Sequence, residues 1–232
     1  MNAALLLLSD SRLPAGGHAH SGGAEQAVAS GAVHDVPSLA GFLHGRLRTA
    51  GAVTAALTAA ACAASARPGV AWGPLDAEVD ARTAAPAQRT ASRTQGRLLV
   101  RVACRIWPSA VLGELARTVP DPHHPIALGA AAHAAGATPE EAAMAAAYQA
   151  VSGPATAVVR LLGLDPVAVH ALLARLTPEL TAVAAEAGRA AANCLPDPGL
   201  PDAWAALPAY SAPALDLLAQ RHARAEVRLF VS

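Results

Sequence analysis

The chain has 232 residues, 53% of them hydrophobic and 3% aromatic, and its 17 basic residues balance its 17 acidic residues. Balanced charge excludes a field that would draw the whole protein to nucleic acid or to an anionic membrane. All 17 basic residues are arginine, which excludes a P-loop lysine and a Schiff-base lysine, and the 63 alanines favour helices over strands.

The cysteines and the apolar stretches give no sign of secretion or of a membrane span. Cys62, Cys104 and Cys194 are odd in number and far apart, which argues against a disulfide framework and against a CxxC metal site. The apolar run 5–8 has neither a positive region before it nor a cleavage pattern after it. The stretch 50–66 is mostly alanine and threonine, too weakly hydrophobic to span a bilayer. We therefore expect a cytoplasmic protein.

A glycine-rich loop at residues 9–24 interrupts the apolar start of the chain, and we expect a helix to begin at Glu25. Four glycines within eight residues are costly to order, so such a loop usually exists where the backbone approaches something closely. The residues that we expect to shape this loop and its exit are Pro14, Gly16, Gly17, Ser21, Gly23 and Glu25.

The next segments carry clear helix starts and stops. Asp35-Val36-Pro37-Ser38 predicts the start of a long helix that runs to about Arg67. Leucines at positions 39, 43 and 47 form its core-facing stripe. A second helical segment, 75–106, is expected to break near Pro86.

Charged residues on the segment 75–106 follow two patterns. Arg93 begins a row of arginines at intervals of four, which is typical of a solvated face and, as an alternative, of a surface for an acidic partner. Asp76, Glu78 and Asp80 alternate, which we expect to scatter their carboxylates over different faces of a helix.

The remaining segments are also predicted to be helical. A proline-rich loop, 120–125, precedes a short helix, 126–135, and Thr138-Pro139-Glu140-Glu141 predicts a further helix start. Pro154 should kink or break that helix, and 165–193 should be helical with a kink or restart near Pro178. We expect 195–213 to be irregular and 215–226 to form the last helix. Residues 1–232 are therefore predicted to form one globular all-α domain of about eight to ten helices.

No arrangement of residues specific to catalysis stands out, and no catalytic residue or cofactor is predicted. His18 and His20 would bind a metal if the loop presented both imidazoles to one ion, but a hydrogen-bonded glycine loop is the simpler interpretation. His123 and His124, between prolines, are more typical of a surface turn than of ligands. A small helical enzyme with His18 or His20 as general base remains an alternative, as does a nickel relay through them.

The C-terminal tail, residues 214–232, combines arginines with an apolar set that includes one of only two phenylalanines. Chain ends fray unless they dock, and arginine and aromatic side chains are favoured at the centres of protein interfaces. Docking onto this domain and docking onto a partner both stay open. The candidate partner-binding residues are Arg221, His222, Arg228, Leu229, Phe230 and Ser232.

These motifs together resemble the UreF family of urease accessory proteins. The loop matches the family pattern Leu-Pro-x-Gly-Gly-x-x-x-Ser-x-Gly-x-Glu at residues 13–25, and further matches lie at 93–96, at 124–129 and in the ending 221–232. The chain departs from the family at His18 and His20, where aromatic residues are common, and at Val231, where a polar residue is usual.

The resemblance implies an all-helical homodimer that acts by binding rather than by catalysis. The protein would hold a UreD/UreH-type accessory protein through its C-terminal tail and present a surface to the accessory GTPase UreG. It would thereby support nickel insertion into apo-urease, with the nucleotide bound by the GTPase. Arg93 and Gly96 are possible interface residues on the same grounds.

Overall fold

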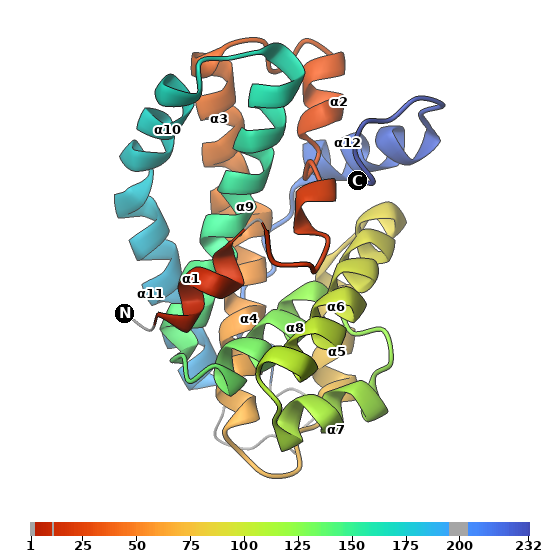
Figure 1. The fold of residues 1–232 in the computed structure, drawn as a ribbon, viewed down its shortest axis with the longest axis vertical. Helices are drawn as coiled ribbons and strands as arrows, with labels where there is room; N and C mark the ends of the chain where they lie inside the picture. The colour runs from red at the N-terminus through yellow and green to blue at the C-terminus, as the bar shows by residue number, and fades with distance from the viewer. Residues whose placement is uncertain (1–2, 11, 195–203) are drawn as a thin grey trace.

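The computed structural model describes residues 3–10, 12–194 and 204–232, and these residues form helices and no strand (Figure 1). The all-α prediction is confirmed. The helices are α1 (Ala4–Ser9), the 3-10 turn η1 (Gly17–Ala19), α2 (Ala24–Ala29), α3 (Val36–Arg46), the π turn η2 (Leu47–Gly51), α4 (Ala52–Ser65), α5 (Trp72–Arg82), α6 (Pro86–Ile106), α7 (Ala110–Thr118), α8 (His124–Ala134), α9 (Pro139–Leu162), α10 (Pro166–Arg175), α11 (Thr177–Asn193) and α12 (Pro213–Arg224).

The number of helices slightly exceeds the expectation. Because α3, η2 and α4 continue into one another over Val36–Ser65, the described residues contain eleven separate α-helices. The sequence reasoning did not predict α1 or α7, which are only six and nine residues long.

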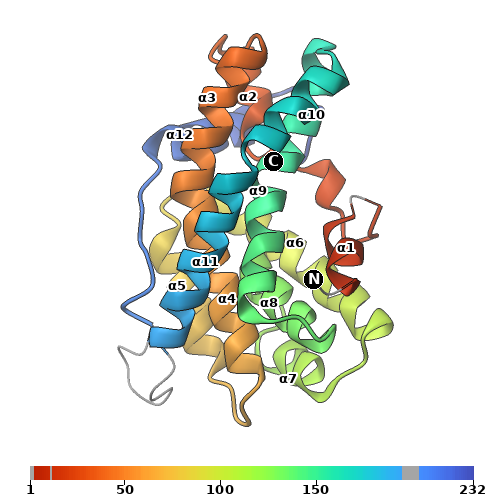
Figure 2. The same ribbon diagram turned by 90° about the vertical axis from the view of Figure 1, so that its left-hand side faces the viewer.

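The helix α4 lies at the centre of the fold, between α8, α9 and α11 (Figures 1 and 2). Most of its 14 residues are buried, and the buried set is rich in alanine, which lets neighbouring helices approach closely. One close approach is at Gly129 of α8, where an added Cβ would lie 2.4 Å from the carbonyl oxygen of Thr58. The alanine-rich composition therefore supports a core built from short distances between helix axes rather than from large side chains.

Two predicted helix starts have the full capping geometry. The Asp35 side chain accepts a hydrogen bond from the Ser38 backbone N–H, and the Ser38 hydroxyl accepts one from the Asp35 backbone N–H. Thr138 and Glu141 form the same reciprocal box at the start of α9. Each box satisfies backbone donors that the first turn of a helix leaves unpaired, so these boundaries are set locally.

The predicted break at Pro154 does not occur, since α9 continues through it to Leu162. A proline lacks the N–H that would bond the carbonyl four residues earlier, which here is that of Ala150. The Nε of Arg46 donates to this carbonyl oxygen at 2.9 Å instead. A side chain from α3 thus replaces the lost backbone donor.

The next predicted boundary is confirmed. α10 and α11 meet at Leu176 with a bend of 46°, as the Thr177-Pro178 restart predicted. The predicted irregular stretch 195–213 lies largely outside the described residues. The last helix begins at Pro213 and ends at Arg224, each two residues earlier than predicted.

The continuous helix Val36–Ser65 has the length and apolar composition of a membrane span. However, 67% of its most apolar window is buried within the fold, as in the core helix of a globular protein. Its π turn, Leu47–Gly51, was not predicted; such turns are rare and often occur at functional sites.

Candidate functional site

The final segment of the chain, residues 227–232, lies along the glycine-rich loop, so the two motifs meet in space (Figure 1). The Val231 N–H donates to the Ala19 carbonyl oxygen at 2.7 Å, and the Ser21 N–H donates to the Ser232 carbonyl oxygen at 2.5 Å. The Ser21 hydroxyl donates to the same Ser232 oxygen. Ser21 is fully buried, so its hydrogen bonds lock the final segment onto the loop.

Glu25, the last residue of the loop motif, holds the final segment from the start of α2. Its carboxylate accepts from the Leu229 N–H at 2.7 Å and from the Phe230 N–H at 3.2 Å. The carboxylate is also 3.5 Å from Nδ1 of His222 on α12. One largely buried carboxylate thus connects α2, α12 and the final segment.

The imidazoles of His20 and His222 complete the junction. His20 Nδ1 lies 2.5 Å from the Ser232 hydroxyl, and His222 Nε2 lies 3.2 Å from the Phe230 carbonyl oxygen. Burial lowers the pKa of His20 to about 4, helped by the nearby His18 and His222 imidazoles. His20 is therefore neutral at pH 7.

The side chains of the final segment point in two directions. Phe230 is buried in this chain, with the Arg160 guanidinium carbon 5.2 Å from its ring centroid, a cation–π distance. Val227, Leu229 and Val231 are instead 85%, 75% and 59% exposed. The final segment therefore packs against its own domain through Phe230 and exposes apolar side chains on its outward face.

Exposed arginines extend this outward face. Arg221, Arg224 and Arg228 are exposed, and within the described part of the chain no acidic side chain pairs with them. Leu217 on α12 is 60% exposed. Of the six candidate partner-binding residues, His222 and Phe230 face inward, whereas Arg221, Arg228 and Leu229 are accessible; partner binding by any of them stays a prediction.

The glycines of the loop have distinct backbone roles. Gly16 and Gly23 adopt positive φ angles of 78° and 91°, which side chains other than glycine rarely accept, whereas Gly17 is exposed in the 3-10 turn. Pro14 is exposed, as is His18. The loop thus turns to place Ser21 and Glu25 against the final segment, while His18 points to the surface.

Arg93 and Gly96, the possible interface residues, lie at a second junction that joins α5, α6 and the start of α8. The Arg93 guanidinium donates to Asp76 at 3.0 Å and to Asp80 at 2.6 Å. An added Cβ on Gly96 would lie 2.0 Å from the Pro122 carbonyl oxygen. Both residues therefore make close contacts within the chain, Arg93 through its ion pairs and Gly96 through its lack of a side chain.

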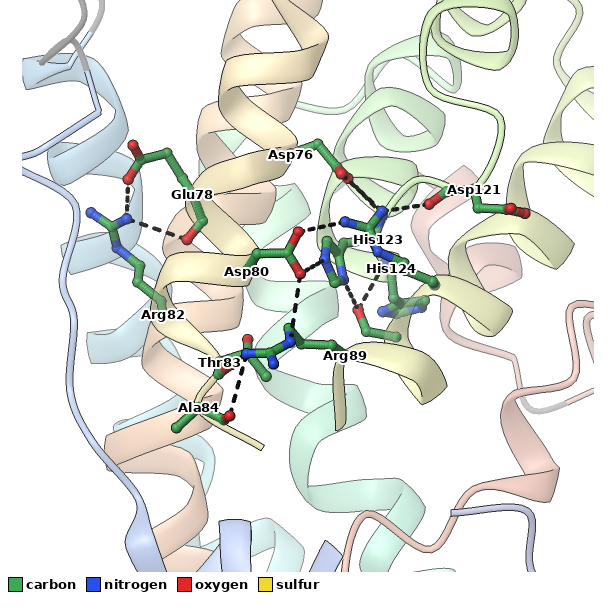
Figure 3. A network of polar contacts seen from close by, with 12 residues as sticks. Asp76, Glu78, Asp80, Arg82, Thr83, Ala84, Arg89, Asp121, His123 and His124 are labelled. Atoms are coloured by element: carbon green, nitrogen blue, oxygen red, sulfur yellow. Dashed lines mark hydrogen bonds and ion pairs between the residues drawn. The ribbon is translucent and has the colours of Figure 1, made fainter. Parts of the chain in front are cut away.

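The expectation that Asp76 and Asp80 would lie on different helix faces is wrong. They are four residues apart on α5 and therefore share a face, while Glu78 turns away to pair with Arg82 (Figure 3). The sequence signal for this shared face is the i, i+4 spacing of the two aspartates, not the alternation of the three acidic residues.

His123 is buried between the two carboxylates (Figure 3). Its backbone N–H donates to the Asp76 carboxylate at 2.8 Å. Its ring Nε2 lies 2.9 Å from Asp80, and its Nδ1 lies 3.0 Å from the Ser92 hydroxyl. Burial lowers the pKa of His123 against the opposing effect of both carboxylates. Burial raises the pKa of Asp80, but hydrogen bonds and charge from His123 and Arg93 outweigh it and hold the pKa low.

One cluster at this junction has the side chains of a metal site. Among the described residues, Asp76, Asp80 and His123 form the one group of three or more potential ligand atoms within 4.8 Å of one another; it includes neither His18 nor His20. Its carboxylates already face the Arg93 guanidinium, and both ring nitrogens of His123 have partners. This group is therefore explained as a structural junction.

Proteins of known name are similar to this chain over nearly its whole length. The sequence model of the UreF family matches residues 33–177. A urease accessory protein UreF from Mycolicibacterium vanbaalenii is 46% identical over 230 residues, covering 99% of this chain and 98% of that protein. A homologue with the same name from Mycobacterium sp. (strain JLS) is 45% identical over 228 residues, covering 98% of this chain and 97% of that protein. Another from Mycobacterium tuberculosis (strain H37Rv) is 41% identical over 230 residues, covering 99% of this chain and 98% of that protein.

Proposed function

Because this chain belongs to the UreF family of urease accessory proteins, we propose that it is an adaptor that binds other accessory proteins during urease assembly. Its partners would be a UreD/UreH-type protein, the GTPase UreG and apo-urease, and its role would be to support nickel insertion in the cytoplasm. Nickel is the cargo of this assembly. GTP would bind to UreG, since this chain has no lysine for a P-loop.

The family is one of accessory proteins and not of catalysts, so the alternative of a small helical enzyme is set aside. The side chains agree with this conclusion. His20 contacts Ser232 of the final segment, and the groove of about 230 Å³ between α4, α11 and residues 206–210 contains neither His18 nor His20.

The observation that carries the adaptor proposal is the two-sided final segment. Its inward face already has partners in the chain. Val227, Leu229 and Val231 expose apolar surface beside arginines that pair with no acidic side chain among the described residues. Apolar and arginine side chains at one site are typical of the energetic centre of a protein interface. We assign this outward face to the UreD/UreH-type partner.

The test is co-expression capture of the UreD/UreH-type protein by outward-face variants. Leu229→Ser combined with Val231→Ser should weaken capture by about 1–3 kcal/mol, the range of interface hot spots, without lowering the melting temperature. Val167→Ser is the matched control, because Val167 is 74% exposed on α10, which lies on the opposite side of α9 from the C-terminus (Figure 1). Capture of the double variant at wild-type strength would contradict this assignment.

We also propose that two copies of the chain associate. Leu6 and Leu7 on α1 are 64% and 56% exposed, beside α9, whose Gln149 side chain donates to the Leu8 carbonyl oxygen. Light scattering should give twice the chain mass for the wild type. A monomeric wild type at micromolar concentration would refute the dimer.

A further inference from the structure

Arg46, near the end of α3, is a cation held by backbone oxygens. Its Nε donates to the Ala150 carbonyl oxygen at 2.9 Å, and its Nη1 donates to the Gly22 carbonyl oxygen at 2.8 Å. Burial lowers the pKa of Arg46 to about 10, so it remains charged at pH 7. Within the described ranges no carboxylate pairs with it.

Each of the two carbonyl oxygens belongs to a different part of the fold. The Ala150 oxygen lacks a backbone donor because residue 154 of α9 is proline. The Gly22 oxygen belongs to the glycine-rich loop, one residue after Ser21, which receives the final segment. The planar guanidinium presents its donors in a fixed fork, so a single side chain fixes the distance between α9 and the loop.

The packing around Arg46 leaves little freedom for the loop to shift. Gly22 has a φ of 61°, and an added Cβ would lie 3.0 Å from Nη2 of Arg46 and 3.1 Å from Cγ of Pro154. The π turn follows Arg46 directly, and an added Cβ on Gly51 would lie 3.3 Å from the Ala150 Cβ. The unpredicted π turn and the proline within α9 thus occur at the same place.

We propose that Arg46 is a positioning residue for partner binding: it fixes the glycine-rich loop against α9 and so holds the final segment with its outward face presented. This inference rests on the proposed adaptor function. The chain of contacts runs from Arg46 to Gly22, from the adjacent Ser21 to Ser232, and so to the exposed side chains of Leu229 and Val231.

The experiment measures hydrogen exchange by mass spectrometry on the full chain, together with capture of the UreD/UreH-type partner. Arg46→Lys keeps the charge but not the fork, and Arg46→Ala removes both. Either substitution should speed hydrogen exchange about tenfold in peptides covering 16–25 and 227–232, and should weaken capture of the partner by a similar factor. A tenfold change is the effect expected from losing one hydrogen bond made by a charged donor. Arg48→Ala is the control, because among the described residues Arg48 pairs with Glu179 alone, at the surface.

The same substitutions made in a Pro154→Ala variant distinguish two roles of Arg46, positioning the loop and donating to the Ala150 carbonyl of α9. Pro154→Ala restores the N–H that bonds the Ala150 carbonyl, so α9 no longer needs Arg46. If Arg46 positions the loop, Arg46→Lys in this background still loosens both peptides. If it only repairs α9, the double variant exchanges like Pro154→Ala alone, and the proposal is overturned.

The two proposals fail in different ways. If the wild type does not capture the partner, the adaptor function fails, while exchange in the isolated chain still tests the role of Arg46. If the wild type captures the partner and Arg46→Lys matches it in both exchange and capture, the positioning role is wrong and the adaptor function stands. Should Arg46→Ala not fold, Arg46→Lys carries the test.

Discussion

Replacing Glu25 by alanine should release the final segment while leaving the rest of the fold intact. The carboxylate accepts two backbone hydrogen bonds, from Leu229 and Phe230, and its side chain is only 11% exposed. A hydrogen bond to a charged group contributes about 1.5 kcal/mol at the lower end of its range. Losing two should lower the free energy of local opening by about 3 kcal/mol, a factor of roughly 150 in the opening equilibrium.

Hydrogen exchange of the C-terminal peptide measures this opening directly. The amides at 229–231 should exchange roughly 100-fold faster in Glu25→Ala, while peptides from α4 and α8 keep their wild-type rates. Glu25→Gln keeps one acceptor oxygen and should give an intermediate rate. Glu186→Ala, at an exposed position on α11, should change nothing. Unchanged exchange at 229–231 in Glu25→Ala would refute the reasoning.

Two further predictions address the second junction and the pH response. Gly96→Ala should destabilise the chain by about 3 kcal/mol in urea unfolding, because the added Cβ would meet the Pro122 carbonyl oxygen. Gly113→Ala, where an added Cβ has no atom within 4 Å, should be neutral or stabilising. Equal effects of the two substitutions would contradict the close contact at Gly96. Because His20 is held neutral with a pKa of about 4 and titrates near 6.5 when unfolded, the unfolded chain binds more protons between these values, so stability should fall as pH drops from about 6.5 to 4. The melting temperature of His20→Asn should depend less on pH across this window than that of the wild type; an identical dependence would refute the assignment.

The sequence predicted what local chemistry decides. The caps at Asp35 and Thr138 and the prolines at 86 and 178 place helix boundaries to within a residue or two, because each acts on hydrogen bonds in its own turn. The break predicted at Pro154 does not occur, for the complementary reason. The donor that replaces the lost backbone N–H comes from Arg46, 104 residues before the Ala150 carbonyl that it bonds, and no local pattern contains it.

The candidate site was only half predictable. Its residues were identified, since Ser21 and Glu25 belong to the loop motif and Phe230 to the tail, but their direct contact spans more than 200 residues. Whether the tail docks on its own domain or on a partner stayed open in the sequence, because composition alone does not give side-chain direction. The structure shows that the self-docked half consists of the Phe230, His222 and Ser232 side chains together with backbone groups.

The two directions of the side chains in the final segment explain why one stretch can serve two contacts. Phe230 is buried against this chain, whereas its neighbours Leu229 and Val231 are exposed. The hydrogen bonds that fix the segment come from Glu25 and the loop backbone, not from the outward side chains. A partner can therefore cover the exposed side chains without displacing what holds the segment. It follows that inward substitutions should affect stability first, and outward ones only assembly.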